Sequence, residues 1–158
     1  MGLDAKVYCD CFEKGRLRTA PLAEWDVYVD KDGSRSARTH HLEEDLVFDH
    51  WNFGACEHEF GILLHHRIGN IAAVELIYSI LFESQQLFPI IMSKIVYDGT
   101  HGGDFIPADQ VALLEPELRT LSKLHCDDSM SEEWIRHFEK QLQELVEIAL
   151  RVGKPISF

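Results

Sequence analysis

The stretch that most constrains the fold is an apolar run over residues 62–82, which contains no proline. Apolar side chains fall on every side of a helix with 3.6 residues per turn, a pattern typical of a helix buried inside a domain. Its first two turns nevertheless carry His65, His66, Arg67 and Asn70, polar groups that are costly to bury without partners. We therefore expect a buried central helix, wrapped by the rest of the chain, whose polar end reaches a cleft or a buried network.

The length of 158 residues fits one globular domain over residues 1–158 with a single core. Fifteen Lys and Arg stand against 27 Asp and Glu, which gives a formal net charge of −12. An acidic surface repels phosphate backbones and anionic lipids, so we expect neither nucleic acid nor a membrane as a partner. Small molecules, cations and basic proteins are the partners that this charge allows.

Acidic residues are concentrated between His41 and His66, where no Lys or Arg occurs. The six acids of this segment are Glu43, Glu44, Asp45, Asp49, Glu57 and Glu59. The simpler interpretation is a solvated helix face, and the alternative is a docking surface for a basic protein.

The sequence favours a cytoplasmic protein. It begins without the apolar segment of a signal peptide, and the charged groups within residues 62–82 argue against a membrane span. The four cysteines (Cys9, Cys11, Cys56 and Cys126) are too scattered for a disulfide scaffold and form no CxxC pair, so reduced thiols are expected.

The elements around the central helix predict the α+β class. Strand-forming residues occupy 7–12 and 27–29, and residues 156–158 are expected to add a C-terminal strand. We expect a mostly helical single domain around the buried central helix, with a small, mostly antiparallel sheet.

The remaining segments are assigned by pattern. Residues 34–41 are polar and predict a loop, whereas residues 42–53 predict an amphipathic helix. Residues 90–97 fit a short helix or a buried strand. A helix starting near Pro107 contains Pro116, which predicts a kink or two short helices. The last helix begins with a capping box, Ser129 to Glu132, and ends at Gly153.

The polar end of the central helix supplies the first candidate site. If the helix extends back to Cys56, then His58 and His65 share one line along it, and Glu59, His66 and Asn70 share the next. Such groups could bind a metal or form an acid–base pair, although the zinc-protease pattern HExxH is absent. In a hydrolytic version His66 is the general base, oriented by Glu59. A buried network that only knits the helix to its neighbours is the alternative.

The second candidate is the glycine-rich loop over residues 98–104, which carries Thr100, His101 and Asp104. Such a loop can bind an anion on its amides or contribute side chains to a cleft, and a plain turn is the alternative. The candidate ligand-binding residues are His65, His66, Arg67, Asn70, Thr100, His101 and Asp104. The candidate catalytic residues are His66, Glu59 and Arg67, and the candidate metal ligands are His58, His65, His101 and Asp104.

Two cysteine features receive a different interpretation. Cys9 and Cys11 lie two apart on a predicted strand, so both sulfurs face one side, as in a zinc site. Because we find no second pair at ligand spacing, the sequence favours two buried core residues. Cys126 is flanked by carboxylates that would raise its pKa, which makes it a weak nucleophile.

The chain resembles a family of uncharacterised bacterial proteins. The resemblance is carried by Met1-Gly2-Leu3-Asp4 with Val7-Tyr8-Cys9-Asp10-Cys11-Phe12-Glu13-Lys14-Gly15, by Ala55-Cys56-Glu57-His58-Glu59 with Leu63-Leu64-His65-His66-Arg67-Ile68-Gly69-Asn70, and by Arg151-Val152-Gly153-Lys154-Pro155-Ile156. It implies a bacterial, single-domain, intracellular protein and brings no activity, cofactor or catalytic residue with it.

Three functional hypotheses follow. The first is a small-ligand or metal-binding domain with a divalent metal as cofactor, for which hydrolysis is left open. In that version Arg67 stabilises developing negative charge beside His66. The second is an acidic protein-interaction module of the inhibitor or immunity type, without catalysis. The third is a homo-oligomer that buries part of the apolar central region at a subunit interface.

Overall fold

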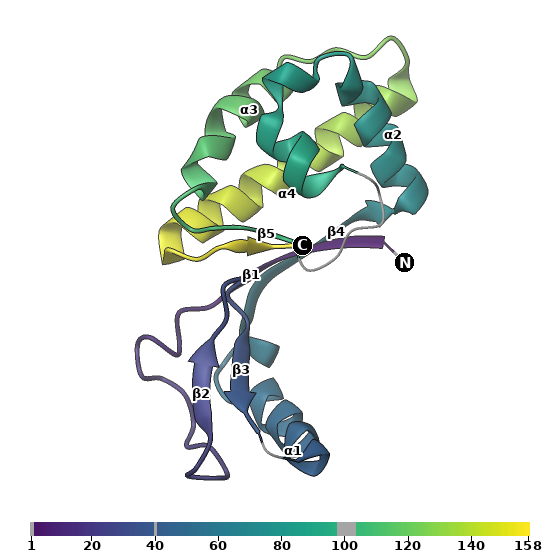
Figure 1. Ribbon diagram of the computed structural model, residues 1–158. Coiled ribbons are helices and arrows are strands. Elements are labelled where there is room, and N and C mark those ends of the chain that lie inside the picture. Colours follow the sequence, from purple (N-terminus) through teal and green to yellow (C-terminus); the bar gives the residue numbers. More distant parts are fainter. Residues whose placement is uncertain (1, 40, 98–103) are drawn as a thin grey trace.

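The structure is a computed structural model that describes residues 2–39, 41–97 and 104–158 (Figure 1). The strands are β1 (Gly2–Tyr8), β2 (Asp26–Val29), β3 (Arg35–Arg38), β4 (Ile62–Asn70), β5 (Phe105–Ile106) and β6 (Ile156–Ser157). The α-helices are α1 (Leu42–Phe53), α2 (Ile71–Phe82), α3 (Leu114–Leu121) and α4 (Ser129–Val152). Short helical turns are η1 (Glu59–Gly61), η2 (Gln85–Leu87), the π-helix η3 (Ile91–Ile95) and η4 (Val111–Leu113).

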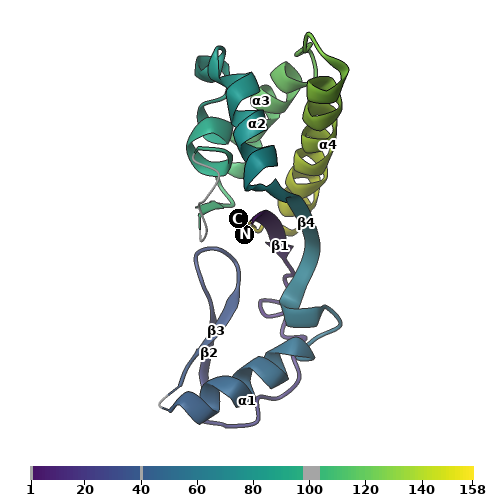
Figure 2. The ribbon, with the colours of Figure 1, turned by 90° about the vertical axis from the view of Figure 1, so that its right-hand side faces the viewer.

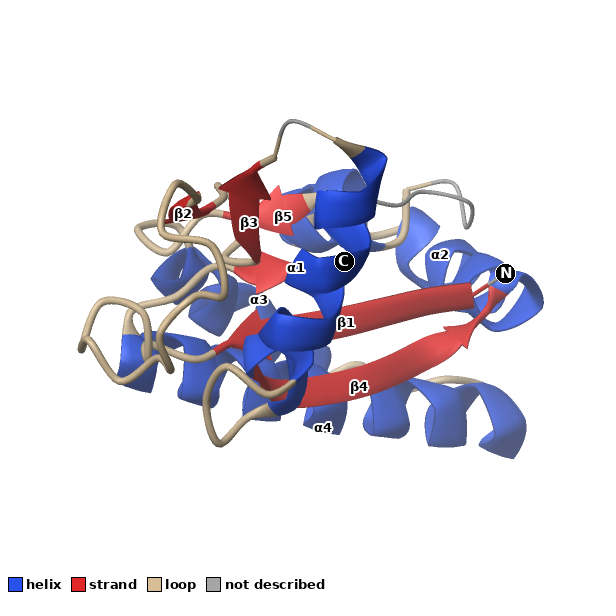
Figure 3. Cartoon of the chain, turned by 90° about the horizontal axis from the view of Figure 1, so that it is seen from below, coloured by secondary structure: helices blue, strands red, loops and turns tan. Residues whose placement is uncertain are grey.

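The main sheet has the order β4-β1-β6-β5, and all of its neighbouring strands are antiparallel. Its longest pairing joins β1 to β4, from Gly2 opposite Asn70 to Tyr8 opposite Ile62 (Figure 3). Alternate residues of β1 are buried, as a strand with one face on a core requires. The pairing also sets the end of β1 beside the start of β4, which positions the candidate site described below.

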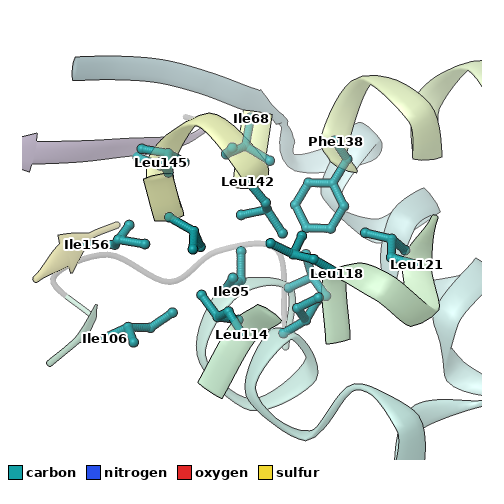
Figure 4. Close-up of a cluster of buried hydrophobic side chains, with 14 of the residues drawn as sticks. Ile68, Ile95, Ile106, Leu114, Leu118, Leu121, Phe138, Leu142, Leu145 and Ile156 are labelled. Carbon is teal, nitrogen blue, oxygen red and sulfur yellow. The ribbon is translucent and has the colours of Figure 1, made fainter. Parts of the chain in front are cut away.

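Helices α2, α3 and α4 cover one side of this sheet (Figure 1). The hydrophobic core lies between them and the sheet, and Figure 4 shows the layer in which Phe138 and Leu142 of α4 meet Leu118 and Leu121 of α3. The apolar stripe of α4 thus faces the core as predicted, and Gly153 ends the helix in the left-handed conformation that favours glycine.

Residues 9–61, here called the lower lobe, lie on the other side of the sheet (Figures 1 and 2). The lobe contains the β2–β3 hairpin and α1, and the hairpin tip at Gly33 packs on Tyr8 and Pro155. None of its described residues belongs to the main hydrophobic core. Its own buried apolar side chains are few: Cys9, Cys11, Trp25, Phe48 and Ala55.

The α+β class, the antiparallel sheet and the C-terminal strand are confirmed, but the long central helix is wrong. Residues 62–70 form β4, and only residues 71–82 are helical. The backbone of β4 pairs with β1, a partner more than 50 residues away that local periodicity does not reveal. Helix α2 is also not buried on all sides. It buries one face and exposes Glu75 and Phe82 to solvent.

Smaller differences from the predictions concern single elements. Residues 34–41, predicted as a loop, contain β3. The first strand covers residues 2–8 instead of 7–12. Of the two alternatives for residues 90–97, the short helix is found, as a π-helix over residues 91–95. The N-cap of α4 is Asp128, whose carboxylate accepts from the Ser131 amide at 2.9 Å. Glu132 does not close a capping box, because its carboxylate accepts from the Cys126 amide at 2.8 Å.

Candidate metal centre

Three thiols and one imidazole meet in the lower lobe at the junction with the sheet. Cys9 and Cys11 follow β1 directly, and Cys56 and His58 precede η1 and β4. One ligand atom from each of the four residues lies within 4.8 Å of every other. The antiparallel pairing of β1 with β4 is what brings these two short segments together.

Backbone hydrogen bonds hold the two ligand-bearing segments on both sides of this Cys₃His cluster. The Cys9 amide donates to the Gly61 carbonyl at 2.7 Å, and the Arg18 amide donates to the Ala55 carbonyl at 2.8 Å. Phe60 and Gly61 both have positive φ values, 51° and 73°, so the chain turns sharply between His58 and β4. A positive φ is uncommon for a residue such as phenylalanine, and it occurs where the surroundings fix the turn.

Two of the distances inside the cluster match the edges of a tetrahedral zinc site, and the four ligand atoms all lie within 4.8 Å of one another. The Sγ atoms of Cys9 and Cys56 are 3.8 Å apart, and Sγ of Cys11 lies 3.6 Å from Nδ1 of His58. Zinc–sulfur bonds of about 2.3 Å and zinc–nitrogen bonds of about 2.05 Å give tetrahedron edges of about 3.8 Å and 3.6 Å. The sulfurs are also too far apart for a disulfide, and all four cysteines are free.

The three thiols of the cluster influence one another's pKa values. Burial, followed by hydrogen bonding and charge interactions with Cys9 and Cys56, raises the pKa of Cys11 to about 12. Burial alone would raise the pKa of Cys56, but a backbone hydrogen bond with His58 and the charge of Arg35 lower it. A metal ion would bind the thiolate forms, so loading the site releases protons.

Arg35 is the charged neighbour of the cluster. Its side chain is buried, Nη1 lies 3.5 Å from Sγ of Cys56, and Nη2 donates to the Asn52 carbonyl at 3.1 Å. Among the described residues it forms no ion pair with a carboxylate, and a buried guanidinium needs a negative partner. Three thiolates around a divalent ion carry a net charge of −1, which Arg35 would neutralise.

Three of the four metal ligands proposed from sequence lie within the described residues, and of these only His58 belongs to this cluster. The prediction that Cys9 and Cys11 are buried is confirmed. Their convergence with Cys56 and His58 was not predicted. The signal that would have found them is present in the sequence: Cys56-x-His58 has the same spacing as Cys9-x-Cys11. A His can complete a site that three cysteines begin.

The predicted His66–Glu59 pair is not formed. His66 lies in β4, and its Nε2 is 2.8 Å from a carboxylate oxygen of Glu144 on α4. Glu59 lies in η1, before the start of the strand, and the four residue steps from Ile62 to His66 alone span about 13 Å.

His65 and Arg67 point to the opposite face of β4 from His66, because side chains alternate along a strand. His65 and Arg67 are exposed, and His65 Nε2 lies 3.3 Å from a carboxylate oxygen of Asp4. The predicted alignment of His58 with His65 is also lost, because no helix joins them: His58 precedes η1, and His65 lies in β4.

The other candidate ligand-binding residues divide into two groups. The Asn70 side chain accepts a hydrogen bond from the Ala73 amide at 2.9 Å and caps α2, which is a structural role. Asp104 offers its backbone carbonyl to the Phe158 amide. Thr100 and His101 lie outside the described residues.

Comparison of the chain with protein-family models, with curated proteins and with solved structures found no match. Among the described residues, no helix is both long enough and apolar enough to cross a bilayer. The Cys₃His cluster is therefore the feature from which a function can be argued, and its donor set is able to hold a metal ion.

Proposed function

We propose that this protein binds one Zn²⁺ ion through Cys9, Cys11, Cys56 and His58, and that the ion has a structural role. The observation that carries the proposal is the convergence of four ligand atoms within 4.8 Å from two segments far apart in sequence. Three thiolates and one imidazole are a donor set typical of structural zinc sites. The Arg35 guanidinium supports the choice, since it balances the charge of the loaded site.

The structural role follows from the number of ligands and from the lobe around them. Four protein ligands complete a tetrahedron, so the ion has no open position for water or substrate. The lower lobe buries few apolar side chains, and two of those are Cys9 and Cys11 themselves. A segment with so small a core needs another source of stability, and a bound zinc ion supplies it.

Metal analysis of protein purified without a histidine tag tests the binding. We expect about one zinc per chain, with loss of zinc in Cys11→Ser and His58→Ala. The matched controls are Cys126→Ser and His66→Ala, which remove the same groups outside the cluster and should keep the metal. Failure of the protein to bind zinc after refolding with the ion, or equal loss in the controls, would refute the site.

Substitution of Co²⁺ for the zinc tests the geometry. Tetrahedral cobalt with thiolate ligands gives visible d–d bands and sulfur-to-metal charge transfer. Both should weaken in Cys9→Ser, while Cys126→Ser should have no effect. An octahedral spectrum would contradict the proposed four-ligand site.

Hydrogen exchange before and after chelation tests the structural role separately from the binding. Removal of the metal should reduce amide protection in β2, β3 and α1 and leave α4 nearly unchanged, because α4 packs in the main core. Unchanged protection of the lower lobe after complete metal removal would exclude a structural role even if zinc binds.

A further inference from the structure

Helix α1 exposes an apolar face to solvent. Leu46 is 69% exposed, Val47 44% and Phe53 46%, and Phe60 of η1 adds a fourth side chain that is 42% exposed. We call these four residues the α1 face. Phe53 and Phe60 contact each other edge to face, with ring centroids 5.2 Å apart. Apolar side chains that gather in this way mark an interaction surface more often than isolated ones do.

The α1 face is not the side by which the helix packs. Phe48 and Asn52 are buried, and Phe48 packs edge to face against Trp25 with centroids 5.7 Å apart. At 100° per residue, Leu46 and Phe53 point nearly opposite to Phe48. The helix therefore has an inner face that meets the lower lobe and an outer face that the described residues leave uncovered.

A cavity of about 460 Å³ adjoins the outer face. Val47, Trp51 and Phe53 line one part of it, and Arg18 and Pro21 of the preceding loop line another. An apolar side chain of a partner could insert into this cavity while the rest of the partner packs along the exposed face of the helix.

The charged side chains of α1 beside this face are all acidic, whereas Arg18 of the preceding loop lines the adjoining cavity. Glu43 and Asp49 flank the line from Leu46 to Phe53, one on each side by helical phase, and both are exposed. Among the described residues neither forms an ion pair. No Lys or Arg occurs in α1 or anywhere in residues 39–66.

We infer that the α1 face is a docking site for a basic, amphipathic segment of another protein. Its apolar side chains would pack on Leu46, Phe53 and Phe60, and its Lys or Arg side chains would meet Glu43 and Asp49. A second copy of this chain fits poorly, because a symmetric contact would place the acidic α1 of one copy against the acidic α1 of the other. The inference goes beyond the zinc site and does not require a metal ion for its chemistry.

The test uses zinc-supplemented full-length protein and two synthetic helical peptides with the same leucine positions. One peptide carries Lys at all polar positions, and the other carries Glu. Isothermal titration calorimetry should detect binding of the Lys peptide alone, and the binding should weaken with added salt.

Surface variants then locate the binding site. Leu46→Ser and Phe53→Ser should each lower the affinity at least tenfold, and Glu43→Gln with Asp49→Asn should reduce both the affinity and its salt dependence. The control is Leu113→Ser, which removes a side chain of similar exposure, 56%, from η4 and leaves the charge of the protein unchanged. Its affinity should equal that of the wild type.

Several results would overturn the inference. They are no binding of the Lys peptide, equal binding of the Glu peptide, or an equal loss in the Leu113→Ser control. Sedimentation that shows a dimer dissociated by Leu46→Ser would assign the face to a second copy and would also overturn it.

Discussion

Sγ of Cys11 lies 3.6 Å from Nδ1 of His58, although 47 residues separate the two in sequence. The same separation joins Cys9 to Cys56, whose sulfurs are 3.8 Å apart. The Cys9-x-Cys11 and Cys56-x-His58 pairs meet because β1 and β4 run antiparallel. One pair follows the end of β1 and the other precedes the start of β4, and these two points lie at the same end of the paired strands.

Arg35→Met should lower the zinc affinity by about 10- to 100-fold, the range usual for loss of a group that supports metal ligands. The substitution removes the charge beside Cys56 and the hydrogen bond to the Asn52 carbonyl. Competition with a chromophoric chelator measures the affinity. The control is Arg38→Met in the same hairpin, because the Arg38 side chain is 78% exposed and pairs with Asp26 rather than with a cluster residue. Equal affinities of the two variants would show that Arg35 does not support the metal.

Gly61→Ala should destabilise the protein by about 1–2 kcal/mol from the left-handed backbone alone. It should also weaken zinc binding, because the new Cβ would lie 2.9 Å from Nη2 of Arg35. Gly15→Ala provides a matched control, since its φ of 62° carries similar strain and nothing lies within 4 Å of the added atom. Urea unfolding and zinc competition on both variants separate the strain from the displacement of Arg35. A zinc affinity in Gly61→Ala no lower than in Gly15→Ala would contradict this account.

Asn70→Ala should reduce the free energy of unfolding by about 1 kcal/mol, because it removes the side-chain cap of α2. Asn70→Asp keeps the acceptor and should retain most of the stability. The zinc content of both variants should equal that of the wild type, since Asn70 lies at the far end of β4 from the cluster. Loss of zinc in Asn70→Ala would return this residue to the list of candidate ligand-binding groups.

Glu132→Gln should change the pH dependence of stability. The hydrogen bond from the Cys126 amide, and then that from Arg136, lower the pKa of Glu132 in the folded protein. A folded-state pKa below the unfolded one stabilises the protein above the unfolded value, about 4.3, and this contribution is lost as the pH falls through the folded pKa. The difference in unfolding free energy between wild type and variant should therefore be largest near neutral pH and narrow in acid. A difference that is constant with pH would contradict the role of this carboxylate.

The sequence by itself determined the elements whose signals are local. The apolar stripe of α4 and the glycine at its end predict that helix within a few residues, and the pattern of residues 42–53 predicts α1. The acidic composition of residues 43–59 was equally visible, and it now lies on and beside the exposed α1 face. Local signals suffice here because helical periodicity and caps are set by residues three or four apart.

Only the tertiary structure decided the nature of residues 62–70 and the identity of the metal ligands. The same apolar residues fit a helix or a strand, and pairing with β1 selects the strand by satisfying its backbone hydrogen bonds. That pairing also separates His65 from His66 and Glu59 from His66, and it joins Cys9 and Cys11 to Cys56 and His58. Strand pairing links distant segments, so a site built on it follows from the register of two strands and not from spacing along one.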